Sequence, residues 1–168
     1  MVADFSDKPT IRGERIVLRP IVAADATSLL ADLDDADGRR LTGTHRTFER
    51  SEIERWAATR SGTDDRIDLA ITDRSTGDWL GEIVVNDWDP ANRSCGFRIA
   101  VARAARDRGF GTEATRLLVD YVFEEIDNPP VNRIELEVFA FNPRAIRVYE
   151  SIGFRREGVR RQALRWDE

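Results

Sequence analysis

One cysteine, one histidine and one lysine are all that the 168 residues contain of these three types. A single thiol, Cys95, excludes an intrachain disulfide framework and a cysteine-rich zinc site, and it suits a reducing compartment. Apolar runs are short, and the segment from Met1 to Lys8 carries three charges, so neither a membrane-spanning helix nor a secretion signal is indicated. We therefore expect a cytoplasmic protein without a metal site and without membrane contact.

The length and the charge limit the range of functions. A chain of 168 residues is typical of one domain, which we place at residues 1–168. The formal net charge of −5 argues against broad nucleic-acid binding. Residues 1–84 hold 12 basic and 17 acidic side chains, whereas residues 85–168 hold 14 of each. Every basic residue except Lys8 is arginine, whose planar fork suits phosphate, so a local arginine site for a phosphorylated ligand stays open.

Hydrophobic periodicity predicts the elements. A capping box of Ser51 and Glu54 is expected to open a helix, and the polar stretch 34–38 is expected to end the helix before it. We predict strands at 11–21, 67–72, 79–85, 95–101 and 132–141, other helices at 23–33, from near 111 to before 128 and at 143–151, and a final strand or extended segment from Phe154.

This order predicts the fold class. Consecutive strands joined by short turns form antiparallel hairpins, and the later strand, helix, strand unit forms a parallel crossover. We expect an α/β (α+β) protein with a mixed, mostly antiparallel central sheet flanked by helices. The sheet should splay where its two parts meet, and ligands favour clefts of that kind.

The segment 106–112 lies between a predicted strand and the long helix. Gly109 and Gly111 permit close backbone approach, the helix N-terminus offers unpaired amides, and Arg106 and Arg108 add charge. These features predict a pyrophosphate site. A Walker loop is excluded because no Gly-Lys-Ser/Thr follows, while a loose dinucleotide pattern from Gly109 to Ala114 and a plain glycine turn are the alternatives.

A second segment, 142–154, follows with Asn142, Ala145, Tyr149 and Gly153-Phe154 at set spacings. Together the two segments resemble the GNAT superfamily of acetyl-CoA-dependent N-acetyltransferases, whose motifs read Arg/Gln-x-x-Gly-x-Gly/Ala and Asn-x-x-Ala/Ser-x-x-x-Tyr-x-x-x-Gly-Phe. The surrounding pattern looks like the RimJ/RimL-like branch, and the resemblance covers roughly residues 11–165.

The resemblance implies acetyl-CoA as the acetyl donor and a direct attack of the acceptor amine on the acetyl group. Tyr149 would protonate the departing thiolate, and a strand amide near Ile99 would stabilise the oxyanion. The residues implied to hold the donor are Ile99, Ala100 and Val101 along the pantetheine arm, Arg106, Arg108, Gly109, Gly111 and Thr112 at the pyrophosphate, and Asn142 at the arm.

The general base stays open. Many members of this branch have a serine at the position of Ala145 and use it as the general acid. Because that serine is absent here, Tyr149 is the favoured general acid. Many members also have a glutamate at the position of Ser94. Glu82 and Asp87, on or beside the middle strand, are candidates through a bridging water, with a solvated carboxylate as the alternative. We expect Cys95 to be core and His45 to be solvated.

The acceptor side should come from the early helices, where Asp32, Asp34, Asp35 and Asp37 would suit a cationic amine. A protein N-terminus and a small cationic amine, such as an antibiotic or a polyamine, are both open, and a catalytically silent acyl-CoA sensor is the alternative from another class. Members of this family add a last strand after 163–166, but the chain stops at Glu168. We therefore expect either a further tail or an edge supplied by a partner, as in a homodimer.

Overall fold

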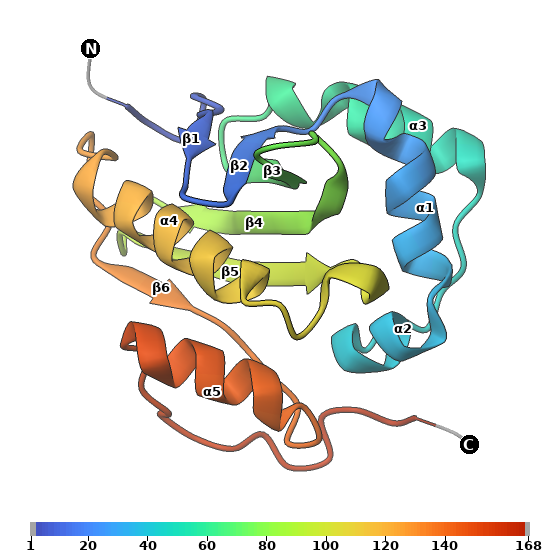
Figure 1. Ribbon diagram of the computed structural model, residues 1–168. Helices are drawn as coiled ribbons and strands as arrows, with labels where there is room; N and C mark the ends of the chain where they lie inside the picture. Colours follow the sequence, from blue (N-terminus) through green and yellow to red (C-terminus); the bar gives the residue numbers. More distant parts are fainter. Residues whose placement is uncertain (1–2, 167–168) are drawn as a thin grey trace.

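The computed structural model describes residues 3–166, in which six strands form one sheet in chain order (Figure 1). The strands are β1 (Ile11–Arg12), β2 (Ile16–Pro20), β3 (Ile67–Asp73), β4 (Trp79–Asp89), β5 (Ser94–Val101) and β6 (Arg133–Glu135). The helices are α1 (Ala26–Asp34), α2 (Ala36–Thr42), α3 (Arg50–Thr59), α4 (Phe110–Glu124) and α5 (Pro143–Ile152), with 3-10 turns η1 (Ala23–Asp25), η2 (Arg60–Gly62) and η3 (Arg103–Ala105).

The sheet is mixed, as expected. Strands β1 to β5 pair antiparallel, and β6 pairs parallel to β5 because α4 carries the chain back across the sheet. Only Ser94–Gly96 of β5 pair with Arg133–Glu135 of β6. From Phe97 to Val101, β5 therefore pairs only with β4 within the described part of the chain, and its other edge carries free backbone groups apart from the Val101 carbonyl, which accepts from Arg106 Nε.

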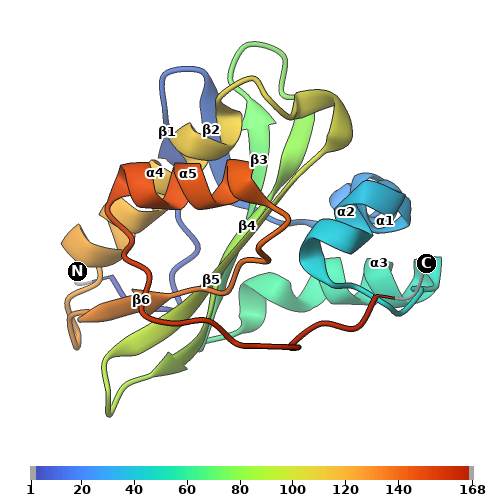
Figure 2. The same ribbon diagram turned by 90° about the horizontal axis from the view of Figure 1, so that it is seen from below.

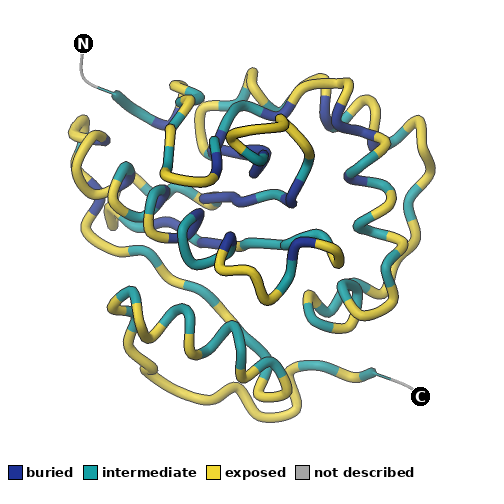
Figure 3. Tube along the Cα trace, in the orientation of Figure 1, coloured by how far each residue is buried: buried dark blue, intermediate teal, exposed yellow. Residues whose placement is uncertain are grey.

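Helices cover both faces of the sheet. Figure 2 shows α4 and α5 on one side and α1, α2 and α3 on the other. The larger core lies between the sheet and α4, where Ala114, Leu118 and Val122 recur every four residues and are fully buried. Figure 3 shows this burial concentrated along the central strands. A smaller core of Ile21, Leu29, Ile53 and other residues packs beneath α1 and α3.

Two predicted strands are shorter than their patterns indicate. The 11–21 segment is a hairpin of β1 and β2, because the chain turns at Gly13, whose amide bonds to the Ile16 carbonyl at 2.9 Å. The 132–141 segment pairs only as far as Glu135, although Leu136 and Val138 keep the alternation. The alternation of apolar and polar residues indicates which side of an extended chain is buried. It does not indicate whether a neighbouring strand is close enough to pair.

The segment after Phe154 is extended, and no strand forms there within the described residues. Its side chains run beside β6, where Arg133 pairs with Glu157 at 2.7 Å and Arg160 pairs with Glu137. The chain's last two residues lie outside the described part, and so do Met1 and Val2.

The helix predictions were wrong at two places. Helix α3 begins at Arg50 with Glu49 as its N-cap, so Ser51 lies inside the first turn and forms no capping box. Helix α2 was not expected, because acidic residues appeared to end the preceding helix. Asp35 caps α2 by accepting from the Gly38 amide at 2.8 Å, and Gly43 ends it in the left-handed conformation.

The only lysine and the only cysteine are both structural. Lys8 Nζ donates to the carbonyl oxygens of Phe5, Thr63 and Arg66, the last two at 2.6 and 2.7 Å, and so ties the N-terminal segment to the start of β3. Cys95 is buried in the larger core, and burial raises the pKa of its thiol to about 12. The expectation that Cys95 is a core residue is confirmed. None of the helices in residues 3–166 is both long and apolar enough to cross a bilayer.

Candidate active site

The loop before α4 presents free amide groups. Asp107 and Gly109 both adopt the left-handed conformation, and α4 begins at Phe110. Glu113 is the first residue of α4 whose amide reaches a helical acceptor, the Gly109 carbonyl at 3.2 Å. Among the described residues, the amides of Phe110, Gly111 and Thr112 have no backbone acceptor. Together with the helix dipole, they form a suitable site for an anionic group.

The two loop glycines are closely packed, and the left-handed backbone of Gly109 favours glycine there. A Cβ at Gly109 would lie 2.9 Å from Arg15 Nη2, and one at Gly111 would lie 3.3 Å from Val101 Cγ2. Arg15, in the turn between β1 and β2, also donates to the Arg108 carbonyl at 2.9 Å, while its own amide donates to Glu113 Oε1 at 2.9 Å. Arg15 thus supports the loop from behind. Sequence reasoning missed it because it lies about ninety positions away.

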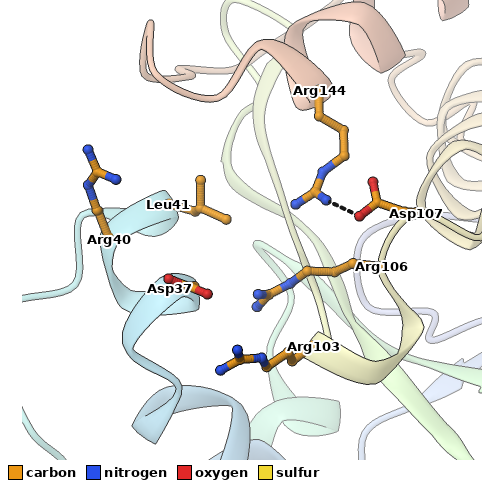
Figure 4. Close-up of a pocket in the computed structure, with 7 residues that line it drawn as sticks. All are labelled: Asp37, Arg40, Leu41, Arg103, Arg106, Asp107 and Arg144. Atoms are coloured by element: carbon orange, nitrogen blue, oxygen red, sulfur yellow. Dashed lines mark hydrogen bonds and ion pairs between the residues drawn. The ribbon is translucent and has the colours of Figure 1, made fainter.

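The arginines near the loop point in different directions. Arg108 is exposed and its guanidinium lies 4.8 Å from the centre of the Phe110 ring. Arg106 turns toward α2 instead, and Arg144 in the first turn of α5 pairs with Asp107 at 2.7 Å (Figure 4). Arg106 and Arg144 border a cavity of about 310 Å³, which is lined by Asp37, Arg40, Leu41, Arg103, Arg106, Asp107 and Arg144.

The free edge of β5 lies next to this loop. Ile99, Ala100 and Val101 are half-buried, and they form the last residues of β5 before the chain turns through η3 into the loop. The backbone groups of this stretch that face away from β4, apart from the Val101 carbonyl, which accepts from Arg106 Nε at 3.0 Å, give an extended ligand a strand edge to bind. The structure therefore brings the strand residues and the loop residues predicted for the donor into one continuous stretch.

Helix α5 positions the other predicted residues. Asn142 is its N-cap, and Asn142 Oδ1 accepts from the Ala145 amide at 3.2 Å. Tyr149 follows seven residues later, about two helical turns on, with its ring edge-on to Phe97 at 6.0 Å between centroids. Burial raises the pKa of the Tyr149 hydroxyl to about 12, so it holds its proton at neutral pH.

Glu82 lies on the opposite face of the sheet from α4. In the strand register it is beside Ala70 and Ala100, and Ala70 belongs to the smaller core under α1 and α3. Its Oε2 atom is shut off from solvent and has no hydrogen-bond partner among the described residues. Burial raises the pKa of Glu82, and the nearby acids Asp68 and Asp32 add to this effect.

The other base candidate lies elsewhere. Asp87 is exposed, in the left-handed conformation near the end of β4, and accepts from Asn86 Nδ2 at 2.8 Å. The solvated alternative therefore describes Asp87, whereas Glu82 is half-buried, with its Oε2 atom shielded from solvent. His45 is exposed, as expected, and its ring lies 4.8 Å from that of Trp166.

The predicted acidic cluster divides into two parts. Asp34 and Asp37 are exposed. Asp32 is half-buried and accepts from Trp79 Nε1 at 2.8 Å, and burial raises the pKa of its carboxyl group. Asp35 pairs with Arg106 at 2.7 Å. Asp32 and Glu82 thus place two carboxyl groups on the side of the sheet covered by α1 and α3, and Trp79 was a partner that the sequence did not reveal.

Comparison with known families decides the assignment. A profile described as "Acetyltransferase (GNAT) domain" matches residues 15–155. The chain belongs to the GNAT acetyltransferase family. One GNAT relative is the SPbeta prophage-derived uncharacterized N-acetyltransferase YokL of Bacillus subtilis, 28% identical over 152 residues that cover 90% of this chain and 82% of the relative. Another is a ribosomal protein bS18-alanine N-acetyltransferase of Salmonella typhimurium, 38% identical over 65 residues, 39% of this chain and 41% of the relative.

Solved structures agree with the GNAT fold. Spermidine N-acetyltransferase from Vibrio cholerae, in complex with CoA and spermine, superposes with a TM-score of 0.79 at 20% identity, covering 87% of this chain and 84% of that one. The predicted fold class, the resemblance to GNAT enzymes and its RimJ/RimL-like branch are confirmed. The protein is an N-acetyltransferase in activity class, and acetyl-CoA is the donor that GNAT enzymes use.

Proposed function

We propose that residues 1–168 form one catalytic domain that transfers the acetyl group of acetyl-CoA to the amine of a cationic acceptor. The observation that carries the proposal is Glu82, a carboxyl group with an unpartnered, solvent-shielded oxygen that is in register with Ala100 on the donor-binding strand. An interior carboxyl group without a partner costs stability, and such groups are retained where they act on a ligand.

The chain's own groups fit the donor. The unpaired amides at 110–112 suit a pyrophosphate, and Gly109, with its left-handed backbone, forms the turn that presents them. Arg108 is free to add a charge-assisted bond, and the unpaired edge of β5 suits the amide groups of a pantetheine arm. Residues proposed to bind the donor are Ile99, Ala100, Val101, Arg108, Gly109, Gly111, Thr112 and Asn142. The side chain of Arg106, which the resemblance also implies for the pyrophosphate, is engaged by Asp35 instead.

The proposed mechanism uses three groups of the chain. Acetyl-CoA, when bound, supplies an acetyl group activated as a thioester. Glu82 accepts a proton from the acceptor's ammonium group, directly or through one water, which frees the nitrogen lone pair to form the new C–N bond. The Ile99 backbone amide donates to the carbonyl oxygen as negative charge develops there. Tyr149 donates its proton to the sulfur as the C–S bond breaks, and the second proton released by the acetylated nitrogen restores the Tyr149 hydroxyl.

The acceptor is proposed to be cationic because Asp32 and Glu82 lie on the side covered by α1 and α3, whereas the neighbouring Asp68 is already paired with Arg66 at 2.7 Å. Two acceptors match this charge, a protein N-terminus and a small cationic amine. The names of relatives and structural neighbours include both kinds, a ribosomal-protein alanine and spermidine. We expect the reaction to take place in the cytoplasm, where a lone thiol such as Cys95 stays reduced.

The test is a thiol-release assay with acetyl-CoA and a panel of amines that includes polyamines, aminoglycosides and peptides with free N-termini. Turnover on any of them supports the proposal, and the ratio of kcat/KM values identifies the acceptor class. Tight binding of acetyl-CoA with no turnover on the whole panel would instead favour a silent acyl-CoA sensor and refute the catalytic proposal.

Tyr149→Phe tests the proposed acid. A thiolate is already a fair leaving group, so we expect kcat to fall by about 10²-fold, near the low end for general acid catalysis. The affinity for acetyl-CoA, measured by calorimetry, should stay within about twofold because the ring contacts with Phe97 and Phe154 are retained. An unchanged kcat would remove Tyr149 from the mechanism.

A further inference from the structure

Arg106 is the first residue of the donor-binding loop, yet its side chain is engaged within the protein. Its guanidinium is only 15% exposed. Nη2 lies 2.7 Å from Asp35 Oδ2, and Nε donates to the Val101 carbonyl at 3.0 Å. Figure 4 shows the side chain pointing away from the loop, across toward α2. Two of its three nitrogens are thus held by the chain itself.

Asp35 occupies the junction of two helices. It ends α1 and caps α2 by accepting from the Gly38 amide at 2.8 Å, through the same Oδ2 atom that faces Arg106. Burial alone would raise the pKa of Asp35, but the hydrogen bonds from Arg106 and Gly38 outweigh it and lower the pKa. The carboxylate is therefore charged at neutral pH and fixes the start of α2.

Gly38 permits this approach. A Cβ at position 38 would lie 2.9 Å from Asp35 Oδ2 and 3.2 Å from Arg106 Nη2. Any other residue would push the guanidinium and the carboxylate apart. Gly38, the capping residue Asp35 and Arg106 thus lie in contact, although Asp35 and Arg106 are 71 positions apart in the sequence.

The pair connects the two sides of the site. Val101 is the last residue of β5, whose free edge is proposed to bind the donor, and Asp35 joins α1 to α2, the helices that cover the acceptor side. We propose that Arg106 and Asp35 are positioning residues that fix the acceptor-side helices against the donor-binding end of β5. This inference rests on the proposed function, because it assigns the acceptor to the α1 and α2 side.

The competing role for Arg106 is direct contact with the donor's phosphates. The two roles differ in which partner matters. If Arg106 acts through Asp35, removing either side chain has the same effect, and removing both adds nothing. If Arg106 binds phosphate, its loss weakens donor binding, whereas loss of Asp35 does not.

The experiment compares Asp35→Asn, Arg106→Gln and the double variant. We expect each single variant to raise the KM for the amine about tenfold, within the coupling range of paired groups, and the double variant to match the singles. The dissociation constant of acetyl-CoA, from calorimetry, should change by less than about twofold in all three. Arg106→Lys keeps the charge and should recover part of the loss.

Arg103→Gln is the matched control. Arg103 also faces Asp35, at 3.5 Å, but its side chain is 74% exposed, so its loss should leave the KM values near those of the unmodified protein. Hydrogen exchange of the amides at 36–42 supplies a readout that needs no activity, and it should accelerate in Asp35→Asn and Arg106→Gln but not in Arg103→Gln.

Three outcomes would overturn the inference: a tenfold loss of acetyl-CoA affinity in Arg106→Gln alone, additive effects in the double variant, or unchanged exchange at 36–42. If the unmodified protein transfers acetyl to no amine, the proposed function fails by that result. The exchange and calorimetry data then still decide whether the pair positions α2.

Discussion

The two faces of the sheet differ in what they bury. Toward α4 the sheet presents only apolar side chains at its centre, such as Leu69, Ile83 and Val85, all fully buried. Toward α1 and α3 the same strands present Asp68, which pairs with Arg66 at 2.7 Å, and Glu82, one oxygen of which has no partner among the described residues. An unpartnered carboxyl group is expensive to bury, so at Glu82 the second face has given up stability that the first retains. The difference indicates that the face toward α4 provides most of the stability, whereas the face toward α1 and α3 carries the proposed catalytic carboxyl group.

Glu82→Gln should produce the largest effect on kcat, and it should separate a catalytic role of Glu82 from a structural one. Loss of the proposed base should lower kcat by about 10²- to 10⁴-fold. The melting temperature should hold or rise, because a neutral amide removes the cost of an interior carboxylate. Thiol release and thermal unfolding measure the two quantities. A variant that loses both activity and stability would show Glu82 to be part of the framework instead.

We also expect Glu82→Gln to change the pH dependence of kcat/KM. Burial raises the pKa of Glu82 above its ordinary value of 4.5, and the ionised form is the proposed base. The kcat/KM of the unmodified protein should therefore fall as the pH drops through that raised pKa, and the fall should be absent in Glu82→Gln. Titration of the acceptor amine is common to both proteins, so it cancels in their ratio.

Leu118→Ala tests the face of the sheet that packs against α4. Leu118 is fully buried at the centre of the larger core, and its truncation should cost about 2–5 kcal/mol of unfolding free energy. Leu29→Ala, in the smaller core, should cost less because α1 and α3 can close over the space. Urea unfolding gives both values. Equal losses would contradict the unequal division of stability between the faces.

Asp25→Asn tests the polar contacts of the second face and should give the smallest effect. Asp25 accepts from both terminal nitrogens of Arg19 at 2.8 Å and from the Val22 amide at 2.9 Å. Because a third of the Arg19 side chain is exposed, we expect a loss of only about 1 kcal/mol at pH 7.

The pH dependence of this loss has a definite sign. Burial alone would raise the pKa of Asp25, but the bonds from Arg19 and Val22 lower it below its ordinary 3.8. The stabilisation is therefore present above pH 3.8 and disappears as the pH falls through the lowered folded-state pKa. Unfolding of both proteins at pH 7 and at pH 3 measures the difference, which should shrink at the lower pH. A constant difference would assign the loss to packing.

Much of the fold could be predicted because it depends on local patterns. The apolar spacing of α4 and the hairpins of β3 to β5 follow from residues close in sequence, and so does the Asn142 cap of α5. The loop before α4 was also predictable, since Gly109 and Gly111 report a backbone that other residues cannot adopt or approach. The homodimer and the cytoplasmic location stay predictions.

Long-range contacts could not be predicted. The burial of Glu82 depends on α1 and α3 covering that face, and from sequence alone a glutamate in a strand is expected to point to solvent even between Gly81 and Ile83. The partners of Arg106 and Arg144 come from other elements, at separations of 71 and 37 positions. Helix α2 was missed because the polar stretch 34–38 predicts the end of a helix, although Asp35 in that stretch also caps the next one.

The engagement of Lys8 has a consequence for an enzyme that acetylates amines. Its nitrogen is surrounded by three carbonyl oxygens, and burial lowers its pKa. Every other basic side chain is an arginine guanidinium, which is not acetylated as an amine is. The chain therefore has no free side-chain amine that the enzyme itself could acetylate. High concentrations of enzyme and donor should leave the charges of Lys8 and of the arginines unaltered.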